Sequence, residues 1–237
     1  MRIHFRFRLI PFVAAVVLMA IGIALAQWQT RRAEEKIALE ATMRERATAP
    51  VLQLLNNLPD IQQTEFRRVS VKGEFLRDWP IYLDNRPYNG VAGFYLLMPF
   101  KMSSSDMHIL VARGWIPRNA NDRTKMPPIS TPQGTIEIEG ILRRDVGHVM
   151  QLGTLDPPQP KAIVQNLDVA TFGNATGLKT LPVVMDQTSD THDGLTRDWP
   201  LPSTGVDKHR GYAFQWYALA AMAFLFFVVT GFRRGTR

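Results

Sequence analysis

The chain has 237 residues, a formal net charge of +7 and no cysteine, which excludes disulfide bonds, thioredoxin-like redox chemistry, haem attached through CxxCH and copper carried on thiolates. Six arginines in the tails 1–8 and 233–237 supply the basic excess, because residues 27–210 hold 22 basic and 21 acidic side chains. That nearly neutral segment has no basic stripe with interleaved aromatics, so we expect no nucleic-acid partner.

Two uncharged apolar segments predict transmembrane helices. Residues 9–26 and 211–232 are 18 and 22 residues long, close to the ~20 residues that a helix needs to cross a bilayer. Arginine beside a span favours the cytoplasmic side. Both tails are therefore predicted to be cytoplasmic, and the segment between the spans is predicted to lie on the opposite side.

The N-terminal segment also has the layout of a cleavable signal peptide, with basic residues, an apolar core and small residues before Gln27. Its apolar core exceeds the ~7 to 15 residues usual for such signals, which favours retention as a membrane anchor. Since no Arg- and Ser-rich transit peptide precedes it, we expect a multi-pass protein of the bacterial inner membrane with a periplasmic central domain.

The first helix is predicted to continue out of the membrane. Residues 27–46 are rich in Ala, Glu, Lys and Arg, and no Gly or Pro interrupts the sequence before Pro50, which predicts a helix to about Ala47. We accordingly divide the chain into a cytoplasmic tail 1–8, transmembrane helix 9–27, helical extension 28–49, periplasmic β-rich domain 50–207, transmembrane helix 208–232 with an interfacial start, and cytoplasmic tail 233–237.

The central domain is predicted to be a mainly antiparallel sheet, in a sandwich or small barrel. Short segments with alternating apolar residues follow Pro50, separated by turn residues. In TIEIEGIL, Ile136 and Ile138 face one way while Glu137 and Glu139 face the other, so one face is in water. A short helix is expected from Asp168 to Gly173 or Gly177. The fold class is thus a membrane α+β protein with two transmembrane helices flanking one β domain.

Motifs that indicate catalysis are missing from the sequence. It has no GxSxG elbow, HExxH, P-loop or GxGxxG after a strand, so we do not expect an enzyme. The nearest approach to a metal site is MDQTSDTHDG, whose spacing fits no standard loop. We interpret this segment, with Asp186, Asp190, His192 and Asp193, as a solvated polar turn.

Aromatic residues gather at the outer ends of the two predicted spans. His209, Tyr212 and Trp216 follow helical spacing and share one stripe, while Trp28 and Arg32 mark the end of the first span. Two explanations stay open. One is an interfacial belt, in which Trp and Tyr lie at headgroup depth. The other is a haem site, in which imidazole ligates iron and arginine pairs with propionates.

Four sequence blocks in this order resemble the surfeit-locus family of cytochrome c oxidase assembly factors over nearly the whole chain. They are WQ at 28 and 29 with Arg32 and Lys36 behind it, GFYLLMPF from Gly93, LVARGWIP from Leu110, and HRGYAFQWY from His209. One departure is Ala26, where the family commonly has glycine, and it concerns helix packing. We interpret LVARGWIP as a strand end with a packed Trp115, although docking of a partner would also explain the block.

The resemblance implies a non-enzymatic factor that binds haem a and assists its delivery to the catalytic subunit of cytochrome c oxidase. It also implies two partners, that subunit and the haem a synthase. His209 carries over as the proposed haem ligand, and therefore as the metal-binding residue. Trp28, Arg32, Tyr212 and Trp216 carry over as motif positions, to which we assign the wall of the haem site.

Two other functions compete with haem delivery. In one, the protein is a cofactor-free membrane chaperone that clamps the catalytic subunit, and its aromatics form a belt. In the other, it is a membrane-bound enzyme acting on haem, which the lack of a coherent set of acid, base or redox groups disfavours.

Overall fold

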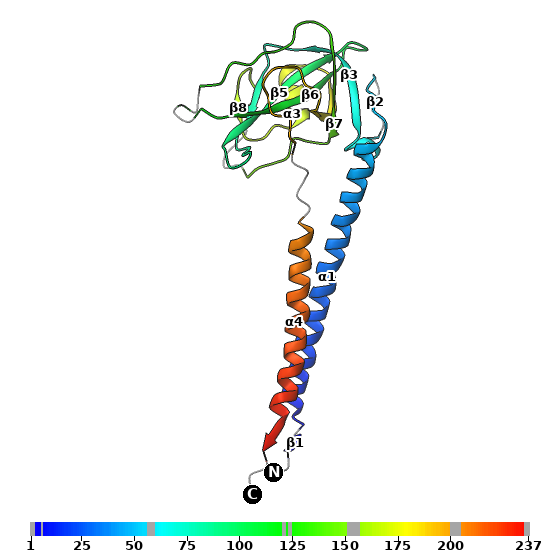
Figure 1. Ribbon diagram of the computed structural model, residues 1–237, viewed down its shortest axis with the longest axis vertical. Helices are drawn as coiled ribbons and strands as arrows, with labels where there is room; N and C mark the ends of the chain where they lie inside the picture. Colours follow the sequence, from blue (N-terminus) through cyan, green and yellow to red (C-terminus); the bar gives the residue numbers. More distant parts are fainter. Residues whose placement is uncertain are drawn as a thin grey trace. The chain divides into compact units, whose positions relative to one another are not determined.

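The computed structural model describes residues 3–5, 7–55, 60–119, 122, 125–150, 157–199 and 205–234. They belong to two compact units. One comprises Met1–Thr42 and Pro202–Arg237, and the other comprises Met43–Leu201. The first unit is mainly helical, and the second contains the larger of the two sheets (Figure 1).

The helical unit pairs the beginning of the chain with its end. It contains α1 (Leu9–Thr48) up to Thr42 together with α4 (Val206–Gly231). The short strands β1 (Ile3–Phe5) and β10 (Phe232–Arg234) pair antiparallel, so the two ends of the described chain lie together (Figure 1). Both helices are long and apolar enough to cross a membrane, by length and composition. The sequence predicted a helix ending near Ala47, and α1 ends at Thr48.

Small residues let α1 and α4 approach closely. A Cβ atom added at Gly22 would lie 3.0 Å from the Cβ of Ala220 and 3.1 Å from the carbonyl oxygen of Trp216. Ala26, the position that departs from the resembled family, is fully buried one turn after Gly22. Ala213 is buried seven residues before Ala220. Small residues at three-, four- and seven-residue spacing are typical of closely packed helices in membranes.

Five strands close into a barrel in the second unit. β3 pairs with β7, β7 with β9, β9 with β6, β6 with β5, and β5 again with β3. All five pairings are antiparallel except β6–β9, which is parallel. The prediction of a mainly antiparallel domain is therefore confirmed, and of its two forms the barrel is the right one. The barrel strands are β3 (Arg68–Phe75), β5 (Gly93–Met102), β6 (His108–Pro117), β7 (Ile136–Arg143) and β9 (Thr180–Gln187).

Shorter elements extend the barrel. β2 (Leu52–Gln53) pairs in parallel with β3, and β4 (Ile81–Leu83) joins β5 to β8 (Ile163–Val164). A single helical turn, α2 (Ile61–Thr64), precedes β3. The helix expected after Asp168 is α3 (Val169–Thr176), which begins with the Asp168 carboxylate accepting from the Thr171 N–H and ends at Gly177 in the left-handed conformation.

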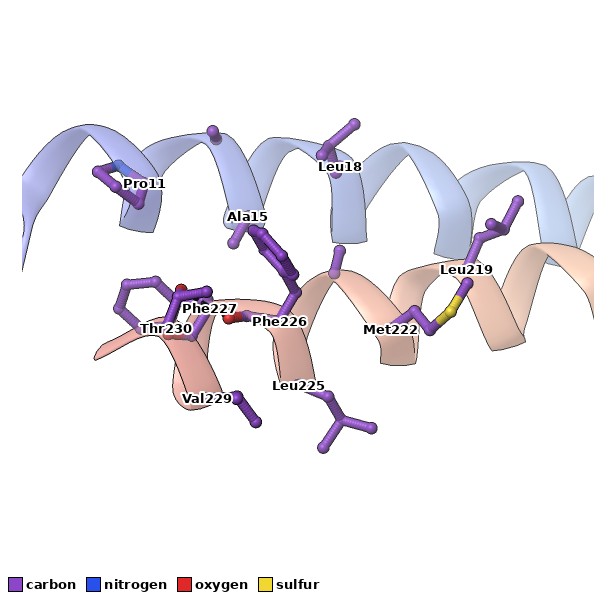
Figure 2. A pocket seen from close by; sticks show the side chains of 12 residues that line it. Pro11, Ala15, Leu18, Leu219, Met222, Leu225, Phe226, Phe227, Val229 and Thr230 are labelled. Carbon is purple, nitrogen blue, oxygen red and sulfur yellow. Dashed lines mark hydrogen bonds between the residues drawn. The ribbon is translucent and has the colours of Figure 1, made fainter. Parts of the chain in front are cut away.

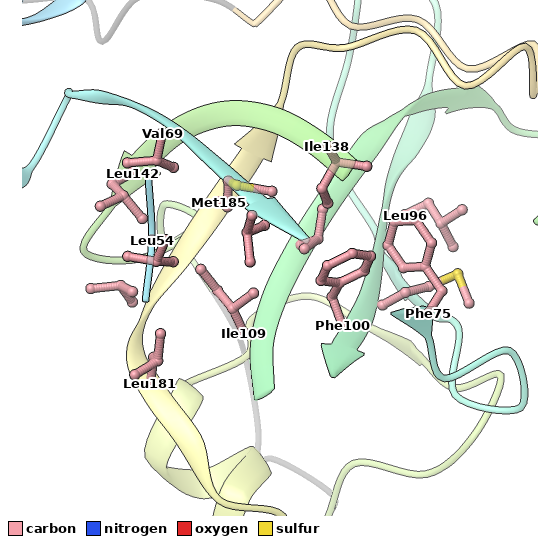
Figure 3. Packing of buried hydrophobic residues seen from close by; sticks show 14 of the residues in the cluster. Leu54, Val69, Phe75, Leu96, Phe100, Ile109, Ile138, Leu142, Leu181 and Met185 are labelled. Carbon is pink, nitrogen blue, oxygen red and sulfur yellow. The ribbon is translucent and has the colours of Figure 1, made fainter. Parts of the chain in front are cut away.

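Apolar side chains fill the barrel and cover part of its outer face. All five barrel strands contribute to the interior, which contains Val69, Leu96, Phe100, Ile109, Ile138 and Met185, among others (Figure 3). Outward residues of β5, β6 and β9 form a second cluster with Phe172 of α3. In β7 the predicted alternation is observed, since Ile138 is fully buried while Glu137 is exposed. The barrel thus has a filled interior and one partly covered outer face.

Candidate functional site

His209 lies in the first turn of α4 and contacts α1. Its Nδ1 atom is 2.7 Å from Oε1 of Gln29, a residue only 9% exposed. An amide oxygen accepts hydrogen bonds, so in this arrangement Nδ1 carries the proton. In the neutral imidazole with this tautomer, the Nε2 atom has a lone pair, and the residue is partly accessible. His209 therefore presents one nitrogen that is able to ligate a metal ion.

The packing of the two helices explains why these side chains meet. Gln29 follows Gly22 by seven residues, which places both on the face of α1 turned toward α4. His209 precedes Ala213 by four residues and Trp216 by seven, so it belongs to the corresponding face of α4. Gln29 belongs to the WQ block of the sequence, but sequence reasoning missed it as a site residue. Its seven-residue spacing from Gly22 was the available signal.

The aromatic residues of the predicted site have different environments. Trp28 and Tyr212 are 45% and 54% exposed, whereas Trp216 is half-buried. The guanidinium of Arg32 lies over the Trp28 ring at 5.9 Å and pairs with Glu35 at 2.8 Å. Within the described ranges, no hydrogen bond or ring contact joins His209 to Trp28, Tyr212, Trp216 or Arg32. The structure thus forms two groups, His209 with Gln29 and Trp28 with Arg32.

The donor set at His209 suits a single axial bond to a haem iron. Imidazoles that ligate metals generally donate their other N–H to an acceptor, which fixes the tautomer and the ring orientation. The Gln29 amide oxygen is such an acceptor. The exposed faces of Trp28 and Tyr212 are apolar surfaces of the kind that holds a macrocycle. The part of the chain that the structure describes contains no cluster of three or more His, Asp or Glu residues able to hold a metal ion.

A groove of about 670 Å³ lies between α1 and α4 away from His209, toward the paired chain ends. Figure 2 shows the Phe226 ring of α4 reaching toward Ala15 of α1. Apart from Thr230 the lining residues are apolar. They include one thioether, Met222, and no imidazole or carboxylate. This groove has the volume of a ligand site but no nitrogen ligand for iron.

The interpretation of MDQTSDTHDG as a solvated turn is wrong for two of its residues. The Asp193 carboxylate is fully buried and receives hydrogen bonds from Arg113 and Arg197, each at 2.6 Å. Asp186 is 7% exposed and lies 3.3 Å from Arg143. Asp190 and His192 are exposed, as expected. Each of the two buried carboxylates has a partner that is remote in sequence, Arg113 for Asp193 and Arg143 for Asp186, and local spacing does not reveal these partners.

The LVARGWIP block holds the returning chain against the barrel. Trp115 is 9% exposed, and its Nε1–H donates to the carbonyl oxygen of Arg86 at 2.7 Å. A Cβ at Gly93 would come 2.4 Å from the Trp115 indole, and one at Gly114 would come 2.7 Å from Leu195. Trp115 also exchanges both backbone hydrogen bonds with Thr196. The packed tryptophan expected from the sequence is therefore observed, and the two glycines leave room for it and for the 195–196 segment.

Comparison with known proteins identifies a family for this chain. Residues 16–221 match the SURF1 family. A SURF1-like protein of Monosiga brevicollis is 25% identical over 94% of this chain and 88% of its own length. One of Rickettsia bellii (strain RML369-C) is 29% identical over 90% of this chain and 86% of its own. The cytochrome oxidase assembly protein SHY1 of Saccharomyces cerevisiae (strain ATCC 204508 / S288c) is 31% identical over 48% of this chain and 30% of its own. Two long apolar helices, a barrel between them and a match over most of the sequence lead to one conclusion: the chain belongs to the SURF1 family.

Proposed function

We propose that this protein is an assembly factor for haem-copper cytochrome c oxidase that binds haem a transiently and assists its insertion into the catalytic subunit. The observation that carries the proposal is the 2.7 Å contact between His209 and Gln29, which leaves Nε2 of His209 free to ligate iron. Membership of the SURF1 family supports it, as does the similarity to an oxidase assembly protein of yeast.

Each site residue has a proposed role. His209 donates Nε2 to the iron, and Gln29 orients the imidazole through its Nδ1–H. Trp28, Tyr212 and Trp216 offer apolar faces to the macrocycle. Arg32 pairs with a propionate, a role compatible with its half-exposed side chain. A single axial bond suits a carrier, because cargo that is held too firmly is not passed on.

The proposed setting is the inner membrane of a bacterium, with α1 and α4 as transmembrane helices. Both termini lie in the cytoplasm and the barrel in the periplasm, an orientation supported by the arginines of the tails and by the pairing of β1 with β10. The partners are the catalytic subunit of the oxidase and the haem a synthase. The protein itself performs no chemistry on haem.

A cofactor-free chaperone is the second candidate, and one observation favours it. Trp28 and Tyr212 are half-exposed without a partner aromatic among the described residues, as expected for residues of an interfacial belt. In this alternative the protein clamps the catalytic subunit and holds no haem. The two functions differ in whether the isolated protein carries a haem spectrum.

The test is an absorption spectrum of the full chain, purified in detergent after coexpression with the haem a pathway. We expect a haem a band in the wild type, and its loss or a shift in His209→Ala. His192→Ala is the matched control, because it removes an exposed imidazole from the barrel and should leave the band unchanged. An unaltered spectrum in His209→Ala would refute the ligand assignment. Copurification of the catalytic subunit with haem-free wild type would favour the chaperone.

A further inference from the structure

A second pocket, of about 320 Å³, opens on the outer face of the barrel. Four neighbouring strands form its base, with Tyr95 from β5, Ala112 from β6, Arg143 from β7 and Asp186 from β9. Loop residues 85–87 and 145–149 and Trp199 form its rim. All of them belong to the barrel unit, and His209 is not among them, so the inference drawn from this pocket does not depend on the proposed function.

The rim of the pocket is held in place by specific hydrogen bonds. The Asn166 side chain bonds both backbone groups of Val149, at 2.8 and 2.9 Å. The Trp199 indole N–H donates to the carbonyl oxygen of Gln187 at 2.7 Å, and its ring meets the Tyr95 ring at 5.0 Å. Ligand sites are usually preformed in this way, with apolar walls and a few fixed polar groups.

Arg86 contributes a buried positive charge to this pocket. The residue is 7% exposed, and its guanidinium donates to the carbonyl oxygens of Asp84, Gly147 and Gln165 at 3.0 to 3.3 Å. No carboxylate forms an ion pair with it among the residues that the structure describes, and the nearby Asp84 carboxylate pairs with Arg118. Burial lowers the pKa of Arg86. Since a buried charge is costly without a counter-charge, Arg86 favours an anion in the pocket.

Arg143 supplies a second guanidinium that is not fully engaged. Its contact with Asp186 is long, at 3.3 Å, and its side chain is 22% exposed. Burial raises the pKa of Asp186 to about 6, against the opposing effect of Arg143 and with a further rise from Asp145. The Tyr95 hydroxyl has no hydrogen-bond partner within the described ranges, and the Arg86 guanidinium lies 5.9 Å from its ring. Arg143 and Tyr95 can thus both donate to a ligand.

We propose that this pocket binds an organic carboxylate, with the anionic group between Arg86, Arg143 and the Tyr95 hydroxyl and the apolar part against Trp199 and Val149. Two guanidinium groups and a phenol form a donor set for a carboxylate. The volume lies at the lower end of the ~300 to 1,000 Å³ usual for ligand pockets, which suits a small acid or a single acidic side chain of a polypeptide.

The test measures ligand binding to the full chain in detergent by the NMR signal of the Trp199 indole N–H. Three probes are titrated, namely N-acetyl-glutamate methylamide for a carboxylate on a polypeptide, glutarate for a free acid, and N-acetyl-glutamine methylamide as the neutral control. We expect a saturable shift with at least one carboxylate and none with the amide. Tighter binding of the glutamate derivative would identify the natural ligand as an acidic side chain of a polypeptide, and tighter binding of glutarate would identify it as a free acid. Equal shifts for all three probes, or no shift with either carboxylate, would overturn the proposal.

Variants of folded protein test which side chains bind the carboxylate. Arg143→Gln is expected to weaken carboxylate binding at least tenfold, and Tyr95→Phe to weaken it less. Asp186→Asn should tighten binding at neutral pH, because it removes the carboxylate that competes for Arg143. A purely structural role for Asp186 would not produce tighter binding. If the folded Arg143→Gln protein binds as well as the wild type, the carboxylate site is wrong.

The pH profile gives a further readout. As the pH falls through about 6, Asp186 becomes neutral, so the wild type is expected to bind the carboxylate more tightly. The Asp186→Asn variant has no carboxyl group at this position, so its affinity should not show this increase. Arg86, Arg143, Asp145, His148 and Tyr95 also face this pocket. His148→Ala removes the imidazole, so it shows whether that group contributes to the pH profile. A wild-type profile that Asp186→Asn reproduces unchanged would contradict the competition between Asp186 and ligand.

Discussion

At the scale of single residues, the buried arginine Arg113 shows how strongly the barrel depends on remote partners. Its side chain is fully buried in β6, with Asp193 at 2.6 Å and the Thr131 hydroxyl at 2.7 Å. The guanidinium also lies 4.6 Å from the Phe75 ring. Removing one partner of a buried ion pair leaves an uncompensated charge, which costs far more than losing an exposed pair. Arg113 is therefore a structural residue of the barrel.

Asp193→Asn is expected to lower the free energy of unfolding by about 3 to 5 kcal/mol at neutral pH, because it leaves Arg113 buried without its carboxylate. Burial raises the pKa of Asp193, but hydrogen bonds from Arg197 and Thr191 outweigh this effect and hold the pKa below its usual value. The stabilisation is thus present above the ordinary carboxyl pKa and is lost as the pH falls through the lower, folded value.

Urea unfolding at neutral and successively more acid pH, followed by circular dichroism, measures this effect. The difference between wild type and Asp193→Asn should shrink toward acid pH. Asp190→Asn is the control, because its carboxylate is 66% exposed and its loss should have little effect. A pH-independent difference would show that the Asp193 charge is not what stabilises the fold.

At the scale of elements, the contact between α1 and α4 is what places Gln29 beside His209. The two helices approach closely at Gly22, since a Cβ there would touch Ala220 and the backbone of Trp216. Helices in membranes pack through such small residues, because lipid provides no hydrophobic driving force for their association. The same contact sets the position along α4 at which Gln29, seven residues after Gly22, meets that helix. A larger residue at position 22 should therefore separate the site residues.

Gly22→Leu is expected to weaken the α1–α4 contact, whereas Gly211→Leu serves as a matched control because a Cβ at Gly211 meets no atom within 4 Å. The chain has no cysteine, so Gln29→Cys and His209→Cys can be introduced together and joined by a short bifunctional thiol reagent. Crosslinking should fall severalfold with Gly22→Leu and stay unchanged with Gly211→Leu. Equal yields in both would mean that Gly22 does not set the packing.

At the scale of the whole molecule, both ends of the chain belong to one helical unit, and the barrel forms from the sequence between its two helices. The pairing of β1 with β10 holds the ends together. If α1 and α4 span a membrane, both tails must then lie on one side of it. The arginines of the tails favour the cytoplasmic side. This topology is a proposal, and it makes a direct prediction about accessibility.

Ser104→Cys, at an exposed position of the barrel, should react with a membrane-impermeant maleimide in intact cells, once the outer membrane is permeable to the reagent. A cysteine appended after Arg237 should react only when the inner membrane is disrupted. Labelling is read by the mobility shift of the purified protein. The reverse pattern would place the barrel in the cytoplasm and would overturn the proposed orientation.

The sequence by itself determined the elements whose signal is local. Length and hydropathy identify α1 and α4, alternation identifies β7, and Asp168 with Gly177 bounds α3. Only the tertiary structure decided what depends on remote contacts. Closure of the barrel rests on the β3–β5 pairing, the charge of Arg113 is balanced by an aspartate 80 residues away, and Gln29 meets His209 across 180 residues. The physical reason is that local patterns report which face of an element is buried, whereas partners are chosen by packing between elements.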